Sequence, residues 1–431
     1  MVQTKLRSWP ELKDPEYLKT NSFVTVESWI EGKQVDDGAE KLWRIHDKLY
    51  DFTEWIQKHP GGETFLRVSK GTDITELFEA HHVSVAAENL LPRFYVREAQ
   101  TPRNSPYTFK DDGFFRVLKR KIREELPSVP KTVRLKSVLI ADSVVATALV
   151  LLVIGSIMKS YLVGLAAGVP LTLGVIAAHN FFHQKPNWRR FYFDLTFLSH
   201  REWIVSHVMS HHIYPNTKMD LEIVMFSPFL QWLPTPEKSW ISRHLSLIYA
   251  PVVYGFLFFA QGIVRFLRKG FQSHDLANLV VPGVILVASS WDIMFTLKLW
   301  VGVIWVASSI FSFIGTTAAH HAPDLFHEGD VPREDRDWGL QQLDAVVDRK
   351  EISGSLPLTL FTFGDHTLHH LFPALDHAVL EHLHPTFEKV CAQFNVHHEA
   401  TPYWTLIKGQ FQQLARTTPR VFPLKAAEKQ R

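Results

Sequence analysis

The sequence predicts a small α+β domain followed by an all-α membrane domain with four transmembrane helices. Before residue 100 the chain is mostly polar and contains short segments rich in β-branched and aromatic residues, which are typical of strands in a small domain. From residue 137 onward, apolar runs near the ~20 residues that cross a bilayer alternate with polar stretches. The mean hydropathy of −0.03 averages over these blocks, so it does not indicate a soluble protein.

The composition limits the class of protein in three ways. The 431 residues carry a net charge of +2, which argues neither for nor against nucleic acid as a partner. The single cysteine, Cys391, excludes an intramolecular disulfide and fits domains that face the cytosol. Residues 1–40 contain no apolar core followed by a small-residue cleavage site, so we expect no secretory signal peptide and a cytosolic amino terminus.

We expect five segments along the chain. They are an N-terminal tail (1–20), the α+β domain (21–100), a basic linker (101–136), the membrane domain (137–400) and a cytosolic C-terminal tail (401–431). Eight Lys and Arg residues gather between positions 116 and 136, just before the first apolar run. Such a segment more often marks the cytosolic flank of a span than a nucleic-acid patch, so we expect no nucleic-acid partner.

The α+β domain contains a turn suited to presenting a histidine. Segments 22–29 and 42–45 have the composition of short strands, and His59-Pro-Gly-Gly62 follows them. The proline fixes one backbone angle and the glycines permit a sharp turn. A histidine on such a turn can occupy an axial position of haem iron, although these four residues alone are more often a plain loop.

A longer stretch, from Leu42 to Val96, resembles the cytochrome b5 domain. The resemblance is carried by Trp43-Arg-Ile-His-Asp-Lys-Leu-Tyr-Asp-Phe52, the His-Pro-Gly-Gly turn, Gly71-Thr-Asp-Ile-Thr-Glu-Leu-Phe78 and His81-His82. It implies a haem b group with His59 as one axial ligand. For the second axial ligand it implies His82, with the adjacent His81 as the alternative.

Two pairs of apolar runs predict four spans. The first pair covers 137–158 and 161–178, and the second covers 276–290 and 296–319. The run at 245–267 is also apolar, but positive charges lie at its end, and they would face the lumen if the run spanned. We therefore predict an interfacial or re-entrant segment there, and this topology places every histidine cluster on the cytosolic side.

Histidines gather at the cytosolic ends of these spans. Positions i and i+4 share a face of an α-helix, so His179 with His183, and His207 with His211, each direct two imidazoles at one place. A lone histidine in such a place is more often structural, whereas sets with repeated ligand spacing predict a metal site. The histidines in these sets are His179, His183, His207, His211, His212, His320, His366, His369 and His370.

The number of imidazoles predicts two metals rather than one structural zinc. A structural zinc closes its shell with four ligands, whereas eight or nine imidazoles suffice for two metals with open positions. Imidazole suits iron, copper and zinc, so the ligand type alone does not choose among them. The haem domain favours iron, because a haem delivers single electrons that a redox-silent zinc pair cannot use.

From about residue 137 to residue 395 the chain resembles the membrane fatty acid desaturases. Their three histidine boxes match the sets that begin at His179, His207 and His366, and the fused haem domain with His369-His370-Leu-Phe-Pro resembles the front-end group. The resemblance implies two irons bound by the eight box histidines. Acyl-CoA desaturases add one further ligand, which matches His320.

Three positions depart from the family pattern. Thr316 stands where acyl-CoA desaturases have an asparagine four residues before the added histidine. His366 replaces the glutamine that front-end enzymes usually have, and the first box reads His-Asn-Phe-Phe-His instead of His-Asp-x-Gly-His. The double-bond position typical of front-end enzymes should therefore not be assumed.

Together the resemblances imply an oxygen-dependent desaturase of fatty acyl chains in the endoplasmic reticulum membrane. Electrons would pass from NADH-cytochrome b5 reductase through the haem to two iron ions, with no catalytic residue beyond the metal ligands. The substrate would be a lipid or an acyl-CoA. Two alternatives stay open: a lipid hydroxylase that uses the same site, and a non-catalytic, membrane-anchored haem protein that carries electrons.

Overall fold

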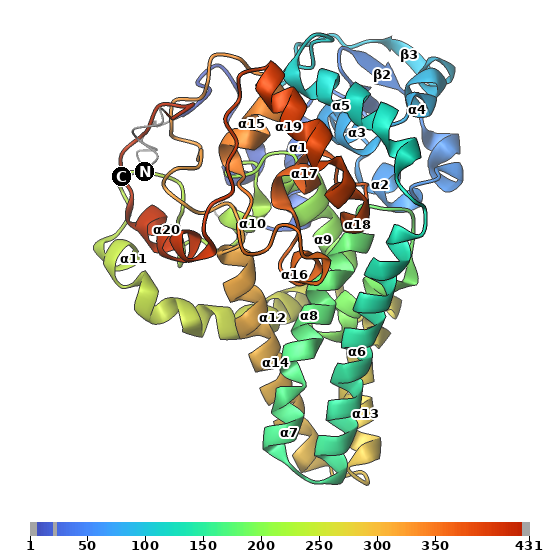
Figure 1. Ribbon diagram of the computed structural model, residues 1–431, viewed down its shortest axis with the longest axis vertical. Coiled ribbons are helices and arrows are strands. Elements are labelled where there is room, and N and C mark those ends of the chain that lie inside the picture. Colours follow the sequence, from blue (N-terminus) through green and yellow to red (C-terminus); the bar gives the residue numbers. More distant parts are fainter. Residues whose placement is uncertain (1–6, 20–23, 425–431) are drawn as a thin grey trace.

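The computed structural model describes residues 7–19 and 24–424. Figure 1 shows a stalk of long helices below a wider head, with the amino-terminal domain at the top of the head. The strands of the described residues form one small sheet in that domain, and the rest of the regular structure is helical. The predicted fold class, a small α+β domain followed by an all-α membrane domain, is confirmed.

The sheet of the amino-terminal domain has three antiparallel strands in the order β1-β2-β3. These are β1 (Trp43–Ile45), β2 (Lys48–Tyr50) and β3 (Tyr95–Glu98). Three short helices follow the His-Pro-Gly-Gly turn: α2 (Glu63–Val68), α3 (Thr75–His81) and α4 (Val85–Leu90). Strands and helices enclose a small aromatic core that contains Trp43, Ile45, Tyr50, Phe52, Leu66, Ile74 and Phe78.

The strand predicted at 22–29 is wrong, because a helix begins inside it. Helix α1 (Val26–Asp36) is capped by Thr25, whose hydroxyl accepts from the Ser28 backbone N–H at 3.2 Å while the Ser28 hydroxyl accepts from the Thr25 N–H at 2.9 Å. This reciprocal cap satisfies donors that a helix start leaves free, and it outweighs the β-branched composition. The first two residues of the predicted strand lie outside the described residues.

The segment predicted as a basic linker contains a helix that packs on both domains. In α5 (Phe114–Glu125) the apolar residues are buried in the core of the head. On its other face, Arg116 and Lys119 hold Glu79 of the amino-terminal domain, at 2.5 and 2.9 Å. Arg123 of the same helix donates to the Val83 carbonyl at 2.6 Å, so three of the eight basic residues before the first span tie the domains together.

The first predicted hairpin is confirmed. It consists of α6 (Val133–Ile157) followed by α7 (Tyr161–Ala166) and α8 (Gly168–Ala178), and both arms are long and apolar enough to cross a membrane. The arms approach closely at the turn, since a Cβ on Gly155 would lie 2.6 Å from the backbone nitrogen of Gly164. Glycine permits that approach.

The second predicted hairpin pairs a long helix with a shorter one. Helix α14 (Ile293–Thr316) is long enough to span. Its partner is a 3-10 segment (Ser273–Leu279) followed by α13 (Val280–Ala288), which together are shorter than the candidate spans but pack against α6 and α14 in the stalk (Figure 1), so the span at 276–290 stays a prediction. A cap at Gln272 starts this piece, and positive φ angles at Ser290 and Trp291 follow its end.

Helix α12 (Ser246–Lys269) is the fourth helix with the length and composition of a span. Four candidate helices agree with the predicted number, although this set, chosen by length and composition, includes α12 and leaves out the shorter piece Ser273–Ala288. Figure 1 shows α12 running across α14 rather than alongside the stalk helices. That orientation agrees with an interfacial segment at 245–267, which stays a prediction.

The other helices of the described residues form the head. The α-helices are α9 (His200–Trp203), α10 (Leu221–Val224), α11 (Trp240–His244), α15 (Trp338–Ala345), α16 (Leu356–Phe361), α17 (His366–Leu371), α18 (His377–Leu380), α19 (His384–Gln393) and α20 (Tyr403–Ala415). A π-helix spans Ile204–His211. Further 3-10 segments are Glu16–Leu18, Thr53–Lys58, Leu91–Arg93, Leu126–Ser128, His179–Phe181, Trp188–Leu195 and Glu381–Leu383.

Candidate metal centre and haem site

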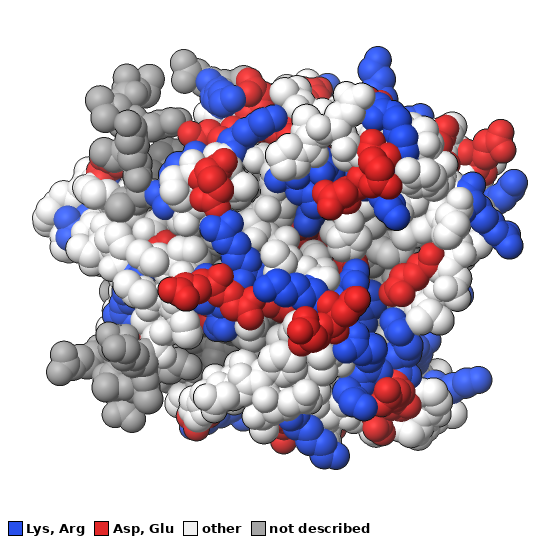
Figure 2. All heavy atoms as spheres, turned by 90° about the horizontal axis from the view of Figure 1, so that it is seen from above, with Lys and Arg blue, Asp and Glu red and all other residues white. Residues whose placement is uncertain are grey.

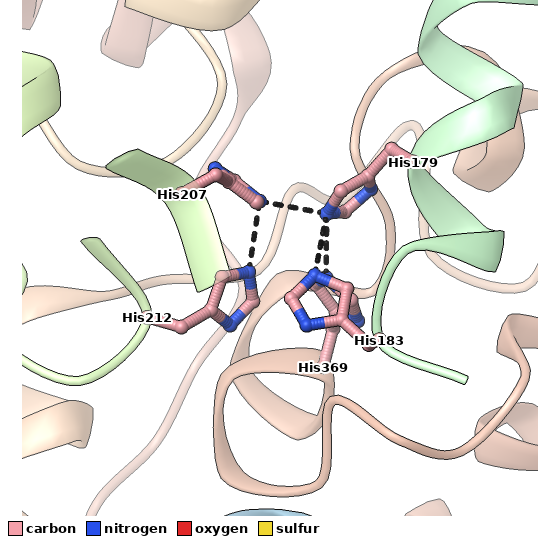
Figure 3. Close-up of side chains that lie close together, drawn as sticks. All are labelled: His179, His183, His207, His212 and His369. Carbon is pink, nitrogen blue, oxygen red and sulfur yellow. Dashed lines mark hydrogen bonds between the residues drawn. The ribbon is translucent and has the colours of Figure 1, made fainter. Parts of the chain in front are cut away.

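The nine predicted histidines converge on two neighbouring clusters where the stalk meets the head. In each cluster, one ligand atom of every member lies within 4.8 Å of those of the others, and every side chain is buried. The first cluster is His179, His183, His207, His212 and His369. The second cluster is His211, His320, His366 and His370. Figure 3 shows the rings of the first cluster turned toward one another from three separate segments of the chain.

The π-helix at 204–211 explains how one histidine box serves both clusters. Hydrogen bonds in a π-helix join residues five apart, and the His212 N–H donates to the His207 carbonyl at 2.9 Å. His207 and His212 therefore both reach the first cluster, while His211 turns to the second. The predicted pairing of His207 with His211 is met in part, because both rings meet Glu222 in a third group of potential ligands, while each ring belongs to a different one of the two all-histidine clusters.

The other two boxes lie at a helix end and within a helix. His179 directly follows α8 and begins a 3-10 turn (His179–Phe181), and His183 lies just beyond this turn, so the pair converges as predicted. On α17, His366 and His370 are four residues apart and both enter the second cluster, while His369 points to the first.

Oxygen acceptors fix the orientation of five of these rings. The Nδ1 atom of His207 lies 2.8 Å from a Glu222 carboxylate oxygen, and that of His211 lies 2.9 Å from Asp220. The Nδ1 atoms of His320, His366 and His370 lie 2.9 to 3.2 Å from carbonyl-type oxygens. An Nδ1 that faces an oxygen must carry the proton, so in the neutral ring Nε2 presents its lone pair to the cluster.

Whether the clusters fit a metal depends on where the Nε2 lone pairs point, and these lone pairs face one another. The Nε2 atom of His320 lies 2.6 Å from that of His366, although each of these two rings already donates from Nδ1. Two acceptors cannot satisfy each other, whereas a cation between them satisfies both. The Nε2 atom of His370 is buried without any hydrogen-bond partner among the described residues. Both donor sets therefore fit a metal that accepts imidazole.

The amino-terminal domain places His59 and His82 opposite each other. Their ring centres are 6.1 Å apart, which leaves room for one metal atom bonded to both at roughly 2 Å. The Nδ1 of His59 donates to the Gly62 carbonyl and that of His82 to the Phe78 carbonyl, each at 2.9 Å, so both Nε2 atoms are free to bind. Burial lowers the pKa of His82 to about 4, which keeps its ring neutral. This pair fits a haem.

His81 lies elsewhere. Its ring stacks on His183 of the first cluster, with ring centres 5.8 Å apart and planes inclined by 24°. The structure thus places His82, and not the alternative His81, opposite His59.

Sequence reasoning missed three residues at the centre. Asp220 and Glu222 hold His211 and His207, and acidic residues shortly after a histidine box are a recognisable clue to such support. His377 lies with its ring 4.5 Å from that of His369, and neither of its nitrogens has a hydrogen-bond partner among the described residues. No repeated spacing marks His377 in the sequence.

The hydroxyl of Thr316, the residue that departs from the family pattern, makes its hydrogen bonds with other residues. Its hydroxyl donates to the Ser312 carbonyl at 2.8 Å and lies 3.0 Å from the Tyr254 hydroxyl. The amide of Asn216 instead contacts the His320 segment, donating to the His320 carbonyl at 2.9 Å. The buried amide of Asn216 thus contacts the segment that carries His320.

A cavity of about 330 Å³ opens onto both clusters. Four of the histidines line it: His207, His211, His320 and His366. Helices α12 and α14 supply apolar walls that include Leu257, Val264 and Phe311. Its lining also includes charged side chains at the end of α12 and the start of α1, among them Arg268, Lys269 and Glu27.

Comparison with known proteins adds the family to this geometry. Residues 159–402, more than half of the chain, match the family model described as fatty acid desaturase. The chain belongs to the fatty acid desaturase family. Residues 28–100 of this desaturase match the cytochrome b5-like heme/steroid binding domain.

Relatives cover nearly the whole length of the desaturase chain. A cytochrome b5-related protein of Drosophila melanogaster is 41% identical, over 94% of this chain and 95% of the relative. A probable Delta(5) fatty acid desaturase C of Dictyostelium discoideum is 25% identical over 88% and 92%, and an acyl-lipid (8-3)-desaturase of Physcomitrium patens is 24% identical over 94% and 93%. No solved structure is significantly similar to the chain.

The chain is thus a desaturase-type oxidoreductase with a fused cytochrome b5 domain, and both predicted resemblances are confirmed. The cytochrome b5 domain implies haem, and the family implies an iron pair. The buried histidine clusters supply donors suited to such a pair.

Proposed function

We propose that this protein introduces a double bond into a fatty acyl chain in an oxygen-dependent reaction. The observation that carries the proposal is the apolar cavity between α12 and α14, which leads to four of the nine clustered histidines. An acyl chain is an apolar rod, and a cavity walled by Leu257, Val264 and Phe311 suits it.

In this proposal the first cluster holds one iron and the second holds the other, while His59 and His82 hold haem b. When bound, the iron pair supplies the oxygen activation that removes hydrogen from two adjacent, unactivated methylenes. The chain's own residues position the substrate. The walls of the cavity hold one methylene pair against the clusters and exclude water, and Glu222 and Asp220 keep His207 and His211 in the tautomer that offers Nε2 inward.

The surface of the stalk supports a position in a membrane. Its helices expose large apolar side chains such as Leu139, Val150, Val301 and Trp305. Figure 2 shows that the opposite face, seen from above, carries acidic and basic side chains mixed together, which suits contact with water. We propose that the protein lies in the endoplasmic reticulum membrane, with the amino terminus, the haem domain and the histidine clusters on the cytosolic side.

NADH-cytochrome b5 reductase is the proposed electron donor, because a haem fused to the oxidase needs only a partner that reduces it. The proposed substrate is a lipid or an acyl-CoA, since the exposed guanidinium of Arg268 lines the same cavity as the apolar walls, while the neighbouring Lys269 pairs with Glu27 and Glu202. An anionic head group could lie there while the acyl chain extends inward.

Lipid analysis of cells that express the protein tests the reaction. We expect fatty acyl products that are lighter by two hydrogens, and we expect none from His211→Ala, which removes an imidazole from the second cluster. A product heavier by one oxygen would instead establish the hydroxylase. If wild type and His211→Ala give the same lipids while the haem is intact, the electron-carrier alternative replaces the proposal.

Narrowing the cavity should restrict the length of the acyl chain. A Cβ on Gly315 would meet only Phe363, at 3.7 Å, so a larger side chain there extends into the cavity. We expect Gly315→Leu to lower conversion of the longest substrates roughly tenfold relative to shorter ones, which is the range that a small change in an apolar pocket produces. Gly315→Ala is the control and should keep the wild-type profile. An unchanged chain-length profile in Gly315→Leu would place the substrate outside this cavity.

A further inference from the structure

His81 lies between the haem site and the first histidine cluster. It directly follows Ala80 in α3 and precedes His82, the residue opposite His59. Its own ring faces away from that pair and stacks on His183, with centres 5.8 Å apart and planes inclined by 24°. One side chain therefore joins the haem pocket of one domain to the metal cluster of the other.

The ring of His81 has a fixed orientation. Its Nδ1 donates to the Leu77 carbonyl at 3.0 Å, and its Nε2 is buried without a hydrogen-bond partner among the described residues. The Nδ1 of His183 is buried and unpartnered as well. The face of the His81 ring, and not a hydrogen bond, therefore makes the contact with His183.

The surrounding contacts hold this ring pair in place. Gly62, in the haem-ligand turn with φ +91°, approaches the loop after His183 so closely that a Cβ would lie 2.7 Å from Cγ of Pro186. Phe65 and Leu77 of the haem domain pack into the apolar clusters of the membrane domain. The two domains therefore meet at a contact that includes His81.

We propose that His81 is the contact through which electrons pass from the haem to the first histidine cluster. This inference rests on the proposed haem and iron sites. Each transfer oxidises one ferrous haem to ferric and reduces one ferric iron in the cluster to ferrous, and no covalent bond forms or breaks. The rate of such a transfer falls steeply with the gap that the electron must cross, and the stacked ring shortens that gap. His81 acts as a positioning residue and does not touch the substrate.

Flash photoreduction of the haem in the full-length, iron-loaded protein tests this role without oxygen, lipid or reductase. A ruthenium dye reduces the haem within the flash, and the decay of ferrous-haem absorbance reports the internal transfer. We expect fast decay in the wild type and no such phase in iron-free protein. In His81→Ala we expect the phase to slow roughly 10- to 100-fold, the range seen for residues that support a metal site. His81→Phe, which keeps a stacked ring, should retain most of the rate.

Haem absorbance and iron content measured on each variant show that both sites are still filled. The matched control is His397→Ala, an exposed histidine that pairs with Glu399 on the surface and should leave the rate unchanged. A wild-type rate in His81→Ala, or equal slowing in the alanine and phenylalanine variants, would overturn the proposal. If the iron-loaded wild type shows no internal transfer, the result contradicts both the role of His81 and the proposed iron pair. If transfer depends on His81 but no lipid is desaturated, only the proposed function fails.

Discussion

Replacing His320 with alanine is expected to remove one of the two irons and abolish turnover while the haem stays bound. The Nε2 atom of His320 lies within 3.0 Å of two other Nε2 atoms of the second cluster, those of His211 and His366. Loss of this ring leaves three imidazoles in that cluster. Changes to residues that only support ligands already cost roughly 10- to 100-fold in affinity or activity, so loss of a ligand should cost at least as much.

Elemental analysis of non-haem iron, together with product formation, measures both effects of His320→Ala. The control is His397→Ala, because His397 is exposed and pairs only with Glu399 on the surface. That variant should keep the iron and the activity of the wild type. Full iron content with full turnover in His320→Ala would show that His320 is not a ligand.

Replacing His82 with alanine is expected to abolish haem binding and leave the iron clusters filled. The two free Nε2 atoms of His59 and His82 face each other, and no other imidazole among the described residues takes that place. The expected result is loss of the haem absorbance in a pyridine haemochrome assay, with non-haem iron retained.

The neighbouring residue provides the comparison for this variant. His81→Ala should keep the full haem absorbance, because its ring stacks on His183 instead of facing His59. Haem loss in His81→Ala with haem retained in His82→Ala would reverse the assignment of the second axial ligand.

All nine histidines of the two clusters could be predicted from the sequence, but their division between clusters could not. The boxes are visible because their spacing repeats at span ends. The division depends on the π-helix at 204–211, which pairs His207 with His212, five residues apart. No residue type marks a π-helix, so an α-helical expectation joins His207 to His211 instead.

The membrane segments could also be predicted only in part from the sequence. Apolar composition alone located the first hairpin and α14, because these runs are long and bounded by polar residues. It misplaced both ends of the run at 276–290, because a cap at Gln272 starts the helical piece earlier and positive φ angles at Ser290 and Trp291 follow its end. Hydropathy reports which residues tolerate lipid, but it does not fix where a helix begins and ends.

Contacts between distant segments were the least accessible part. The ring of His81 stacks on that of His183, about a hundred positions further along the chain. His377 lies beside His369, but no repeated spacing marks it in the sequence. The packing of the haem domain onto the membrane domain brings His81 to His183, whereas His377 reaches His369 from the start of the next helix, α18. The acidic support from Asp220 and Glu222 is different, because a carboxylate soon after a histidine box is a clue that the sequence does contain.

The measurement that tests the central claim most directly is total iron against haem in the purified protein. Two filled clusters and one haem predict about three irons per haem, by elemental analysis beside a pyridine haemochrome assay. About one iron per haem, unchanged after anaerobic iron loading, would contradict an iron pair at the nine histidines. The electron-carrier alternative would then describe the protein better.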